Sequence, residues 1–314
     1  MKEITKDTTI KELCKAKEFK KFGKYIPFPI SLTKKIYPFT LETIQNNFML
    51  PYDVDLNVKA MNTLLNKKRD HEEIFYLLKK DCFIIPYIIG DDRPFVLVIP
   101  GGGYGDVALM SEGFPIAQRI NELGYNAFIL RYRVGKEAHY PNPQDDVYSA
   151  LSFIFENAED WNVSTANYAV CGFSAGGHLA ASWCTKNVGY LKYGFTKPKT
   201  CILAYPVISM DVKTHGDSRK MLLGEENINN KELIKAYSID KQIDGDFPST
   251  YCFQFKDDDI VPSDNTLLLK DALDKANVKN KCYLVEGTIH GCGTGKYTVA
   301  DGWLDEAIDF WING

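Results

Sequence analysis

The sequence lacks the features of a membrane protein, of a nucleic-acid-binding protein and of a disulfide-built or metal-built domain. No apolar run approaches the roughly 18 residues that a membrane span needs. A formal net charge of −4 at pH 7 provides no basic surface for nucleic acid. Eight cysteines are scattered along the chain without a Cys-x-x-Cys pair. We therefore expect buried free thiols, no bound metal or other cofactor, and no membrane or nucleic-acid partner.

Repeats, low-complexity tracts and an apolar N-terminal segment are also missing. The first 25 residues are charged throughout and contain no apolar core of a secretory signal, so we expect a cytoplasmic protein. The 314 residues are 45% hydrophobic and 25% charged, which is typical of a globular protein. This length suits one large α/β domain with an extension, or two small domains.

From residue 94 onward, short apolar runs alternate with segments of helical periodicity. Strands are expected at 94–100, 126–134, 166–173, 200–208, 249–255 and 280–287. Helices are expected over 112–123, from about 143, after Pro262 and over 301–313. Continuous apolar strands that alternate with amphipathic helices predict the α/β class, with a mostly parallel sheet covered by helices on both faces.

Residues 1–70 have a different pattern and are expected to form a mostly helical N-terminal extension of the domain over 71–314. Thr9 and Glu12 make a capping-box pattern, and 40–48 and 58–68 are expected to be helical. The proline-rich stretch 24–39 is expected to be irregular, while 72–80 fits either a helix or a first strand. The extension can act as a cap over a site, a packing layer or a homodimer contact.

The stretch 172–176 reads Gly-Phe-Ser-Ala-Gly, between an apolar strand and a helix-like segment. This is the setting of a nucleophile elbow, a turn so sharp that the serine adopts a strained backbone. Side chains two residues on either side would clash, hence the glycines. The turn presents the Ser174 hydroxyl at a helix N-terminus, where developing negative charge is favoured. A plain tight turn is the alternative, but the flanking strand and helix favour Ser174 as a nucleophile.

A serine hydroxyl needs a base, and in an elbow architecture the chain order is Ser, then Asp or Glu, then His. Of five histidines, only His215 and His290 follow Ser174. His290 lies in a glycine-rich loop after the last expected strand, where the base belongs. His215 precedes the acidic candidates and fails the order test. His178, inside the helix after the elbow, is expected to pack or hydrogen-bond locally.

The acid should follow the strand at 249–255, where Asp257, Asp258 and Asp259 stand in a row. A buried carboxylate there would orient the imidazole and stabilise its protonated form. Asp257 is nearest the strand end and is favoured, with Asp258 as the alternative. The two aspartates that do not fill this role would form a solvated turn at the start of the next helix.

Ester or amide chemistry also needs donors for an oxyanion. One is the backbone N–H of Ala175, directly after the serine. The glycine run at 101–103 follows the strand at 94–99 and lets the backbone approach a substrate closely. A phosphate cradle fits less well, because the Walker lysine is absent and the spacing is not Gly-x-Gly-x-x-Gly. Tyr104, beside the glycines, either lines an acyl pocket or is an ordinary packed tyrosine.

Residues 80–314 resemble the α/β-hydrolases, and within them the esterase/lipase-like branch that includes acetyl esterases and the carbohydrate esterases found beside xylan-degrading enzymes. The stretches that carry the resemblance are PGGGY at 100–104, YPNPQDD at 140–146, GFSAGGHLAA at 172–181, AYPVIS at 204–209, DDDIVPSDN at 257–265 and HGCGTG at 290–295. Two positions depart from it. Pro100 replaces the histidine of His-Gly-Gly-Gly, and Gln254 replaces a glycine often found before the acid.

The resemblance implies specific roles for residues of this chain. Ser174, Asp257 and His290 correspond to the nucleophile, acid and base. The oxyanion donors correspond to Gly102, Gly103 and Ala175. The aspartate motif is also similar to the Asp-Asp-x-Val-Val-Pro of prolyl-oligopeptidase-like peptidases, where the first aspartate belongs to the triad, and this favours Asp257 over Asp258.

The implied activity is a serine carboxylesterase acting on short acyl chains, with a small-molecule ester, such as an acetylated sugar, as its partner and an acyl-enzyme as its intermediate. An arylformamidase or a prolyl-oligopeptidase-like peptidase would use the same triad, although 70 residues are too few for the propeller domain of such a peptidase. A third reading is an inactive hydrolase that serves as a binding module. The complete set of catalytic groups argues against it.

Overall fold

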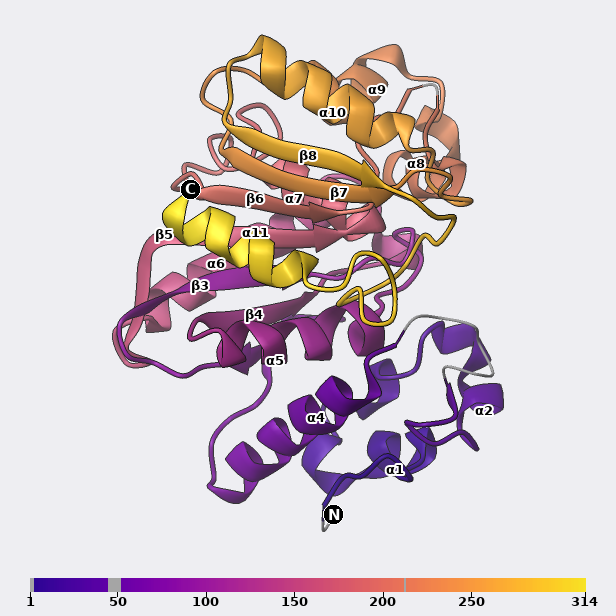
Figure 1. The fold of residues 1–314 in the computed structure, drawn as a ribbon, viewed down its shortest axis with the longest axis vertical. Helices are drawn as coiled ribbons and strands as arrows, with labels where there is room; N and C mark the ends of the chain where they lie inside the picture. Colours follow the sequence, from indigo (N-terminus) through magenta and orange to yellow (C-terminus); the bar gives the residue numbers. More distant parts are fainter. Residues whose placement is uncertain (1–2, 45–51, 212) are drawn as a thin grey trace.

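The computed structural model describes residues 3–44, 52–211 and 213–314, and these contain an eight-stranded sheet covered by helices (Figure 1). The strands are β1 (Tyr76–Lys79), β2 (Cys82–Tyr87), β3 (Arg93–Ile99), β4 (Asn126–Arg131), β5 (Val163–Phe173), β6 (Thr200–Ala204), β7 (Ser249–Phe255) and β8 (Asn280–Val285). Their order in the sheet is β1-β2-β4-β3-β5-β6-β7-β8. Only β2 pairs antiparallel with its neighbours, β1 and β4, so the sheet is mostly parallel as expected.

Helices cover both faces of this sheet. Figure 1 shows α5 (Phe114–Glu122) and α11 (Trp303–Asn313) in front of it, and α6 (Asn142–Asn157) and α7 (Ser174–Trp183) behind it. The remaining helices of the domain are α8 (Gly216–Leu223), α9 (Lys231–Tyr237) and α10 (Asp264–Lys275). Shorter turns are the π-helical η4 (Leu109–Gly113) and the 3₁₀ turns η5 (Gly135–Glu137), η6 (Glu225–Asn227) and η7 (Ile239–Lys241). This arrangement confirms the predicted fold class.

The six strands expected from the sequence correspond to β3 through β8, and the four expected helices to α5, α6, α10 and α11. The ambiguous segment 72–80 contains a strand, β1. Strand β2 was not expected; it is buried along its whole length and pairs through Pro86 with Phe128 of β4. A proline inside a strand weakens its sequence signal, because proline has no N–H to donate to the ladder.

The N-terminal segment packs onto the sheet domain through α4 (Val54–Arg69). The Tyr87 hydroxyl donates to the Ala60 carbonyl at 3.0 Å, and the Thr63 hydroxyl donates to the Gln118 side chain on α5 at 2.8 Å. Figure 1 shows α4 lying beside α5, with α1 (Ile10–Lys15) and α2 (Thr33–Ile36) further out. The 3₁₀ turns η1 (Lys17–Phe19), η2 (Gly23–Tyr25) and η3 (Ile30–Leu32) complete the extension.

Local expectations for the extension agree with its structure where it is described. The Thr9 hydroxyl accepts from the Glu12 N–H, and the Glu12 carboxylate accepts from the Thr9 N–H at 2.8 Å, which is the predicted capping box. The expected helix at 58–68 lies within α4, and the proline-rich stretch 24–39 forms only short turns and α2. Of the helix expected at 40–48, residues 45–48 lie outside the described residues.

All eight cysteines are unpaired, and all but Cys14 are buried. None of the helices in the described ranges is long and apolar enough to cross a membrane. Because β3, β5, β7 and β8 run in the same direction, their carboxyl ends meet along one edge of the sheet. The loops that carry the sequence motifs leave the sheet at this edge.

Candidate active site

The elbow at Ser174 has the strained geometry that its sequence predicts. Ser174 is the first residue of α7 and has a φ of 51°, a left-handed value that is uncommon for a residue with a side chain. A Cβ on Gly172 would lie 2.4 Å from the Gly176 carbonyl oxygen, and one on Gly176 would lie 2.2 Å from the Ile99 carbonyl oxygen. Glycine is therefore required on both sides for β5 to turn directly into α7.

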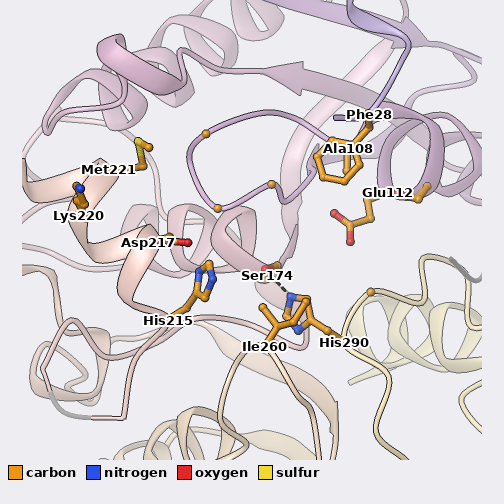
Figure 2. A pocket seen from close by; sticks show the side chains of 15 residues that line it. Phe28, Ala108, Glu112, Ser174, His215, Asp217, Lys220, Met221, Ile260 and His290 are labelled. Carbon is orange, nitrogen blue, oxygen red and sulfur yellow. Dashed lines mark hydrogen bonds between the residues drawn. The ribbon is translucent and has the colours of Figure 1, made fainter. Parts of the chain in front are cut away.

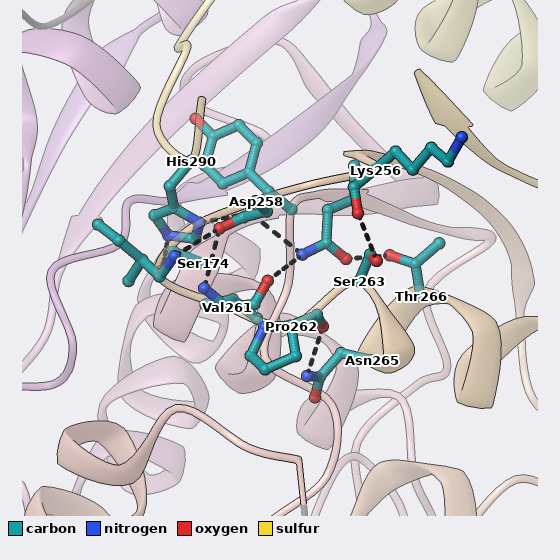
Figure 3. Close-up of polar contacts among 12 residues, drawn as sticks. Ser174, Lys256, Asp258, Val261, Pro262, Ser263, Asn265, Thr266 and His290 are labelled. Carbon is teal, nitrogen blue, oxygen red and sulfur yellow. Dashed lines mark hydrogen bonds and ion pairs between the residues drawn. The ribbon is translucent and has the colours of Figure 1, made fainter. Parts of the chain in front are cut away.

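His290 reaches the elbow from the loop that follows β8. Its Nε2 lies 2.7 Å from Ser174 Oγ, as Figure 3 shows. The edge of the imidazole packs against the ring of Tyr205, with centroids 5.1 Å apart. The serine is only 7% exposed, so the pair is largely shielded from water. This geometry allows the imidazole to take the hydroxyl proton directly.

The carboxylate beside the imidazole belongs to Asp258, and the expectation of Asp257 is wrong. Asp258 Oδ2 lies 2.8 Å from His290 Nδ1, and the Asp258 side chain is completely buried. Its other oxygen accepts from the backbone N–H groups of Ile260 and Val261 at 3.0 and 2.9 Å (Figure 3). These two donors hold Oδ1 in place and leave Oδ2 directed toward the histidine.

Asp257 is exposed and lies in the turn that directly follows β7. The Lys256 N–H donates to the Val285 carbonyl at 2.8 Å and the Asp257 N–H donates to the Gly287 carbonyl at 3.0 Å. The Asp258 N–H donates back to the Phe255 carbonyl at 3.4 Å, so the chain turns at Lys256 and Asp257, and the side chain of Asp258 is the one that is buried. Distance from the strand end was therefore a poor guide to which aspartate faces the imidazole.

Gln254, a departure from the family pattern, supports the same carboxylate. Its side-chain amide donates to Asp258 Oδ2 at 3.1 Å and to the Val261 carbonyl at 2.7 Å. Its carbonyl oxygen accepts from the Thr266 hydroxyl on α10 at 2.7 Å. Gln254 is fully buried near the end of β7, and its amide helps to fix the orientation of the Asp258 carboxylate.

The glycine loop after β3 lies across from the serine. The Gly102 carbonyl accepts from the N–H groups of Gly105 and Asp106, both at 3.0 Å, which folds the loop into a tight turn. The amides of Gly102 and Gly103 have no acceptor among the described residues, and both glycines line the pocket. Gly103 has a φ of 64°. Ala175 lies in the first turn of α7, where a backbone N–H has no partner within its helix.

Of the two alternatives for Tyr104, the structure confirms the packed tyrosine, and the weak assignment to the pocket lining is wrong. With a φ of 60°, the chain turns its side chain back into the core, where the hydroxyl lies 2.8 Å from His178 Nδ1. His178 Nε2 in turn lies 2.7 Å from the Tyr237 carbonyl oxygen. Burial lowers the pKa of His178 to about 4, so this imidazole is neutral at pH 7. As expected, His178 hydrogen-bonds locally.

A cavity of about 530 Å³ opens in front of Ser174 and His290 (Figure 2). Its remaining lining residues come from the glycine loop, the turn after it, α8, the loops at the sheet edge and the extension. They are Phe28, Gly102, Gly103, Gly105, Ala108, Ser111, Glu112, His215, Asp217, Lys220, Met221, Ile260 and Gly291. The cavity therefore has an apolar part at Phe28 and Ala108 and a polar part along α8 (Figure 2).

The polar part of the cavity was not expected from the sequence. His215, set aside as a base, directly precedes α8, and its Nδ1 lies 2.8 Å from the Ser218 hydroxyl. A Cβ on Gly103 would lie 3.6 Å from His215 Cε1, so this edge of the ring faces the glycine loop. Burial lowers the pKa of His215. Asp217 and Lys220 continue the wall along the same helix. No local motif marks these residues; only the packing of α8 beside the glycine loop brings them to the site.

The extension also reaches the cavity. Phe28 lines it, and two residues later the Ile30 N–H donates to the Asp106 carboxylate at 2.6 Å. Asp106 belongs to the glycine loop, so this bond ties the extension directly to the loop beside Ser174.

Glu112 is a further residue of the site that was not expected from the sequence. Its buried carboxylate lies behind Gly101.

Comparison with known proteins agrees with this architecture. The model of the BD-FAE family matches residues 83–273, a range that includes Ser174 and Asp258. A Butyrivibrio fibrisolvens protein named endo-1,4-beta-xylanase B is 32% identical over 232 residues, which are 70% of this chain and 36% of that protein. An acetylxylan esterase of Xylanibacter ruminicola is 27% identical over 220 residues, which are 69% of this chain and 45% of that protein. The chain thus spans less than half the length of these two relatives.

A solved structure with a comparable sequence identity shares the fold. The acetyl ester-xyloside bifunctional hydrolase from Caldicellulosiruptor lactoaceticus superposes with a TM-score of 0.65 at 30% sequence identity. The match covers 74% of this chain and 87% of that one. The matched family model covers more than half of this chain, and the fold agrees with that of a solved esterase-like hydrolase. The chain therefore belongs to the BD-FAE family and is an esterase/lipase-like α/β-hydrolase.

Proposed function

We propose that this protein is a carboxylic ester hydrolase that removes short acyl groups, acetyl above all, from carbohydrate esters. The observation that carries the proposal is the continuous hydrogen-bonded line from Ser174 Oγ through His290 to Asp258, at 2.7 and 2.8 Å. It lies beside a glycine loop whose Gly102 and Gly103 amides have no acceptor within the described chain. Together these groups are sufficient for acyl transfer to serine.

In the first half-reaction, His290 Nε2 takes the proton of Ser174 as Oγ attacks the ester carbonyl carbon. The negative charge that develops on the carbonyl oxygen is held by the backbone N–H groups of Gly102, Gly103 and Ala175. Asp258 stabilises the imidazolium and keeps its Nδ1 proton directed inward. The imidazolium then gives its proton to the alcohol oxygen, the carbon–oxygen bond breaks, and the acyl group remains on Ser174.

In the second half-reaction, water takes the place of the departed alcohol. His290 removes a proton from this water as its oxygen attacks the acyl carbon, and the same amides hold the second oxyanion. When the tetrahedral intermediate collapses, His290 returns the proton to Ser174 Oγ and the carboxylic acid leaves.

The carbohydrate part of the proposal is supported by the relatives and by the cavity. Of the proteins described above, one is named an acetylxylan esterase and another an acetyl ester-xyloside bifunctional hydrolase. The α8 wall with His215, Asp217 and Lys220 provides polar groups beside Ser174, and these suit a hydroxyl-rich alcohol. Phe28 and Ala108 form an apolar end, which suits a short acyl group. Through Phe28, the extension acts as part of the pocket wall.

The test is hydrolysis of p-nitrophenyl esters from acetate to octanoate, and of an acetylated xylo-oligosaccharide, by the wild type and by Ser174→Ala. We expect turnover of acetate and of the sugar ester, poor turnover of octanoate, and a loss of about 10⁴-fold or more in the variant. If the wild type cleaves an N-formyl aryl amine or a dipeptide amide but no ester, the triad serves a different bond. If it cleaves none of them and ignores a fluorophosphonate probe, the proposal is wrong.

A further inference from the structure

Glu112 is a buried carboxylate beside the candidate triad that the mechanism above does not use. It belongs to the π-helical turn η4, is 5% exposed and lines the cavity (Figure 2). Within the described ranges, no lysine or arginine lies at ion-pair distance from it. A buried carboxylate without a cation is costly, so its place beside Ser174 calls for a function. π-Helical turns are themselves frequent at functional sites.

Both oxygens of this carboxylate accept hydrogen bonds. Oε2 accepts from the Gly101 N–H at 2.7 Å, and Oε1 accepts from the Tyr205 hydroxyl at 2.9 Å. The Tyr205 oxygen accepts from the Gly293 N–H at 3.0 Å, which directs its own proton toward Glu112. An amide and a phenol that both donate to Glu112 favour its ionised form. Burial raises the pKa of Glu112, and the bonds from Gly101 and Tyr205 offset only part of this rise.

The two partners belong to the two loops that must meet at Ser174. Gly101 begins the glycine loop, and a Cβ on it would lie 2.8 Å from Ser174 Cβ and 2.9 Å from Glu112 Oε2. Tyr205 packs its ring on His290 and binds Gly293 of the histidine loop. A Cβ on Gly293 would lie 2.4 Å from the Ser111 carbonyl oxygen, so that loop rests on the turn that carries Glu112.

We propose that Glu112 is a positioning residue that clamps the oxyanion loop to the histidine loop and supports the protonated state of His290 with a buried negative charge. The inference rests on the proposed ester hydrolysis. Through its bond to the Gly101 N–H, the carboxylate fixes the orientation of the peptide that leads into Gly102. Through its bond to Tyr205, whose ring packs on His290, it fixes the position of the imidazole. His290 becomes positively charged in both half-reactions, and a fixed negative charge in a low-dielectric interior stabilises that state.

Several titratable groups share this interior and also act on the charge of His290 or Glu112. They are Asp258, Tyr205, His215, Tyr132, Cys171 and Cys292. Burial raises the pKa of the tyrosine and cysteine side chains, so they stay neutral at pH 7. Asp258 and Glu112 are therefore the two carboxylates that face the imidazole from opposite loops.

The test compares Glu112→Gln, Tyr205→Phe and the control Glu122→Gln, with p-nitrophenyl acetate as substrate. Glu122 lies at the exposed end of α5, where it pairs with Lys59 and Arg119, so the same chemical change there should leave kcat unchanged. For Glu112→Gln we expect kcat to fall by about 10²-fold with KM within about threefold of wild type, because the loops lose their alignment. Tyr205→Phe keeps the ring that packs on His290 but removes the hydroxyl that bonds to Glu112 and Gly293, and for this variant we expect kcat to fall by about tenfold.

The pH profile separates the charge from the packing. Without the negative charge of Glu112 the imidazolium is less favoured, so the acidic limb of kcat/KM moves to lower pH in Glu112→Gln and stays in place in Tyr205→Phe. A folded Glu112→Gln protein with the kcat of wild type overturns the proposal, and so does a loss of kcat with an unmoved limb. If this variant does not fold, Tyr205→Phe decides, because an unchanged kcat there overturns the clamp.

The proposed function can fail separately from this inference. In that case the wild type shows no turnover of any ester that depends on Ser174. The rate at which a fluorophosphonate labels Ser174 then replaces kcat in the same variants. A labelling rate that falls in Glu112→Gln and not in Glu122→Gln supports the clamp, and equal rates in both overturn it.

Discussion

The two sides of the cavity are built from different kinds of chain segment. One side is the edge of the sheet, where the loops after β3, β5, β7 and β8 bring the glycine loop, Ser174, Asp258 and His290 together. The other side is a wall made by Phe28 of the extension and by the polar face of α8. The first side carries groups for a chemical step, and the second carries groups that can select a substrate. Changes at the sheet edge should therefore affect every ester, whereas changes in the wall should alter the preference among esters.

The largest effect within this comparison is expected at Asp258. Asp258→Asn removes the charge that stabilises the imidazolium and changes the tautomer of His290, so kcat for all esters should fall by about 10⁴-fold. The measurement is kcat for p-nitrophenyl acetate and for an acetylated xylo-oligosaccharide. The neighbouring Asp257→Asn is the matched control and should keep the activity of wild type, because that side chain is exposed. Equal damage in the two variants would contradict the assignment of Asp258.

A smaller, substrate-dependent effect is expected at His215. His215→Phe keeps a ring against the glycine loop but removes the nitrogen atoms that can bind a hydroxyl. We expect kcat/KM for the acetylated xylo-oligosaccharide to fall by about tenfold, the value of one hydrogen bond, with p-nitrophenyl acetate nearly unaffected. His139, exposed and outside the cavity lining, provides the control His139→Phe. Equal losses on both substrates would mean that His215 takes part in the chemical step, and would contradict the division between a catalytic sheet edge and a selective wall.

The smallest effect is expected at Phe28. Phe28→Ala enlarges the apolar end of the cavity, so the ratio of kcat/KM for octanoate to that for acetate should rise by about three- to tenfold. Leu77→Ala, at an exposed position of β1, is the control for loss of an apolar side chain elsewhere. A ratio that does not change would mean that the extension touches the cavity without selecting the acyl group.

Two aspartates show where sequence reasoning reaches its limit at the site. Ser174 and His290 could be selected because an elbow motif and chain order are properties of the sequence. Asp257 and Asp258 are adjacent and chemically identical, so only the path of the backbone distinguishes them. The chain turns at Lys256 and Asp257, where the Asp258 N–H donates back to the Phe255 carbonyl, and this turn leaves Asp257 exposed and the Asp258 side chain buried. A rule based on distance from the strand end cannot detect which residue of such a turn faces inward.

The fold, like the site, was only partly predictable from the sequence. Strands β3 to β8 were predictable because each is a short apolar run between turn residues or helical segments. Strand β2 was not, because Pro86 interrupts its signal and its place is set by pairing with β4. For Tyr104 the position in the chain left both a pocket residue and a packed tyrosine open, and only its left-handed backbone, which turns it inward toward His178, decides between them.

The α/β class, the nucleophile elbow and the candidate base follow from the sequence alone, because hydrophobic periodicity, paired glycines and motif order are local properties of the chain. Which aspartate faces His290, which residues form the wall, and how Glu112 joins the two loops depend on contacts made only in the folded molecule. These contacts join residues far apart in the chain, and no local pattern records them. Their positions follow from how strands, helices and the extension pack around one edge of the sheet.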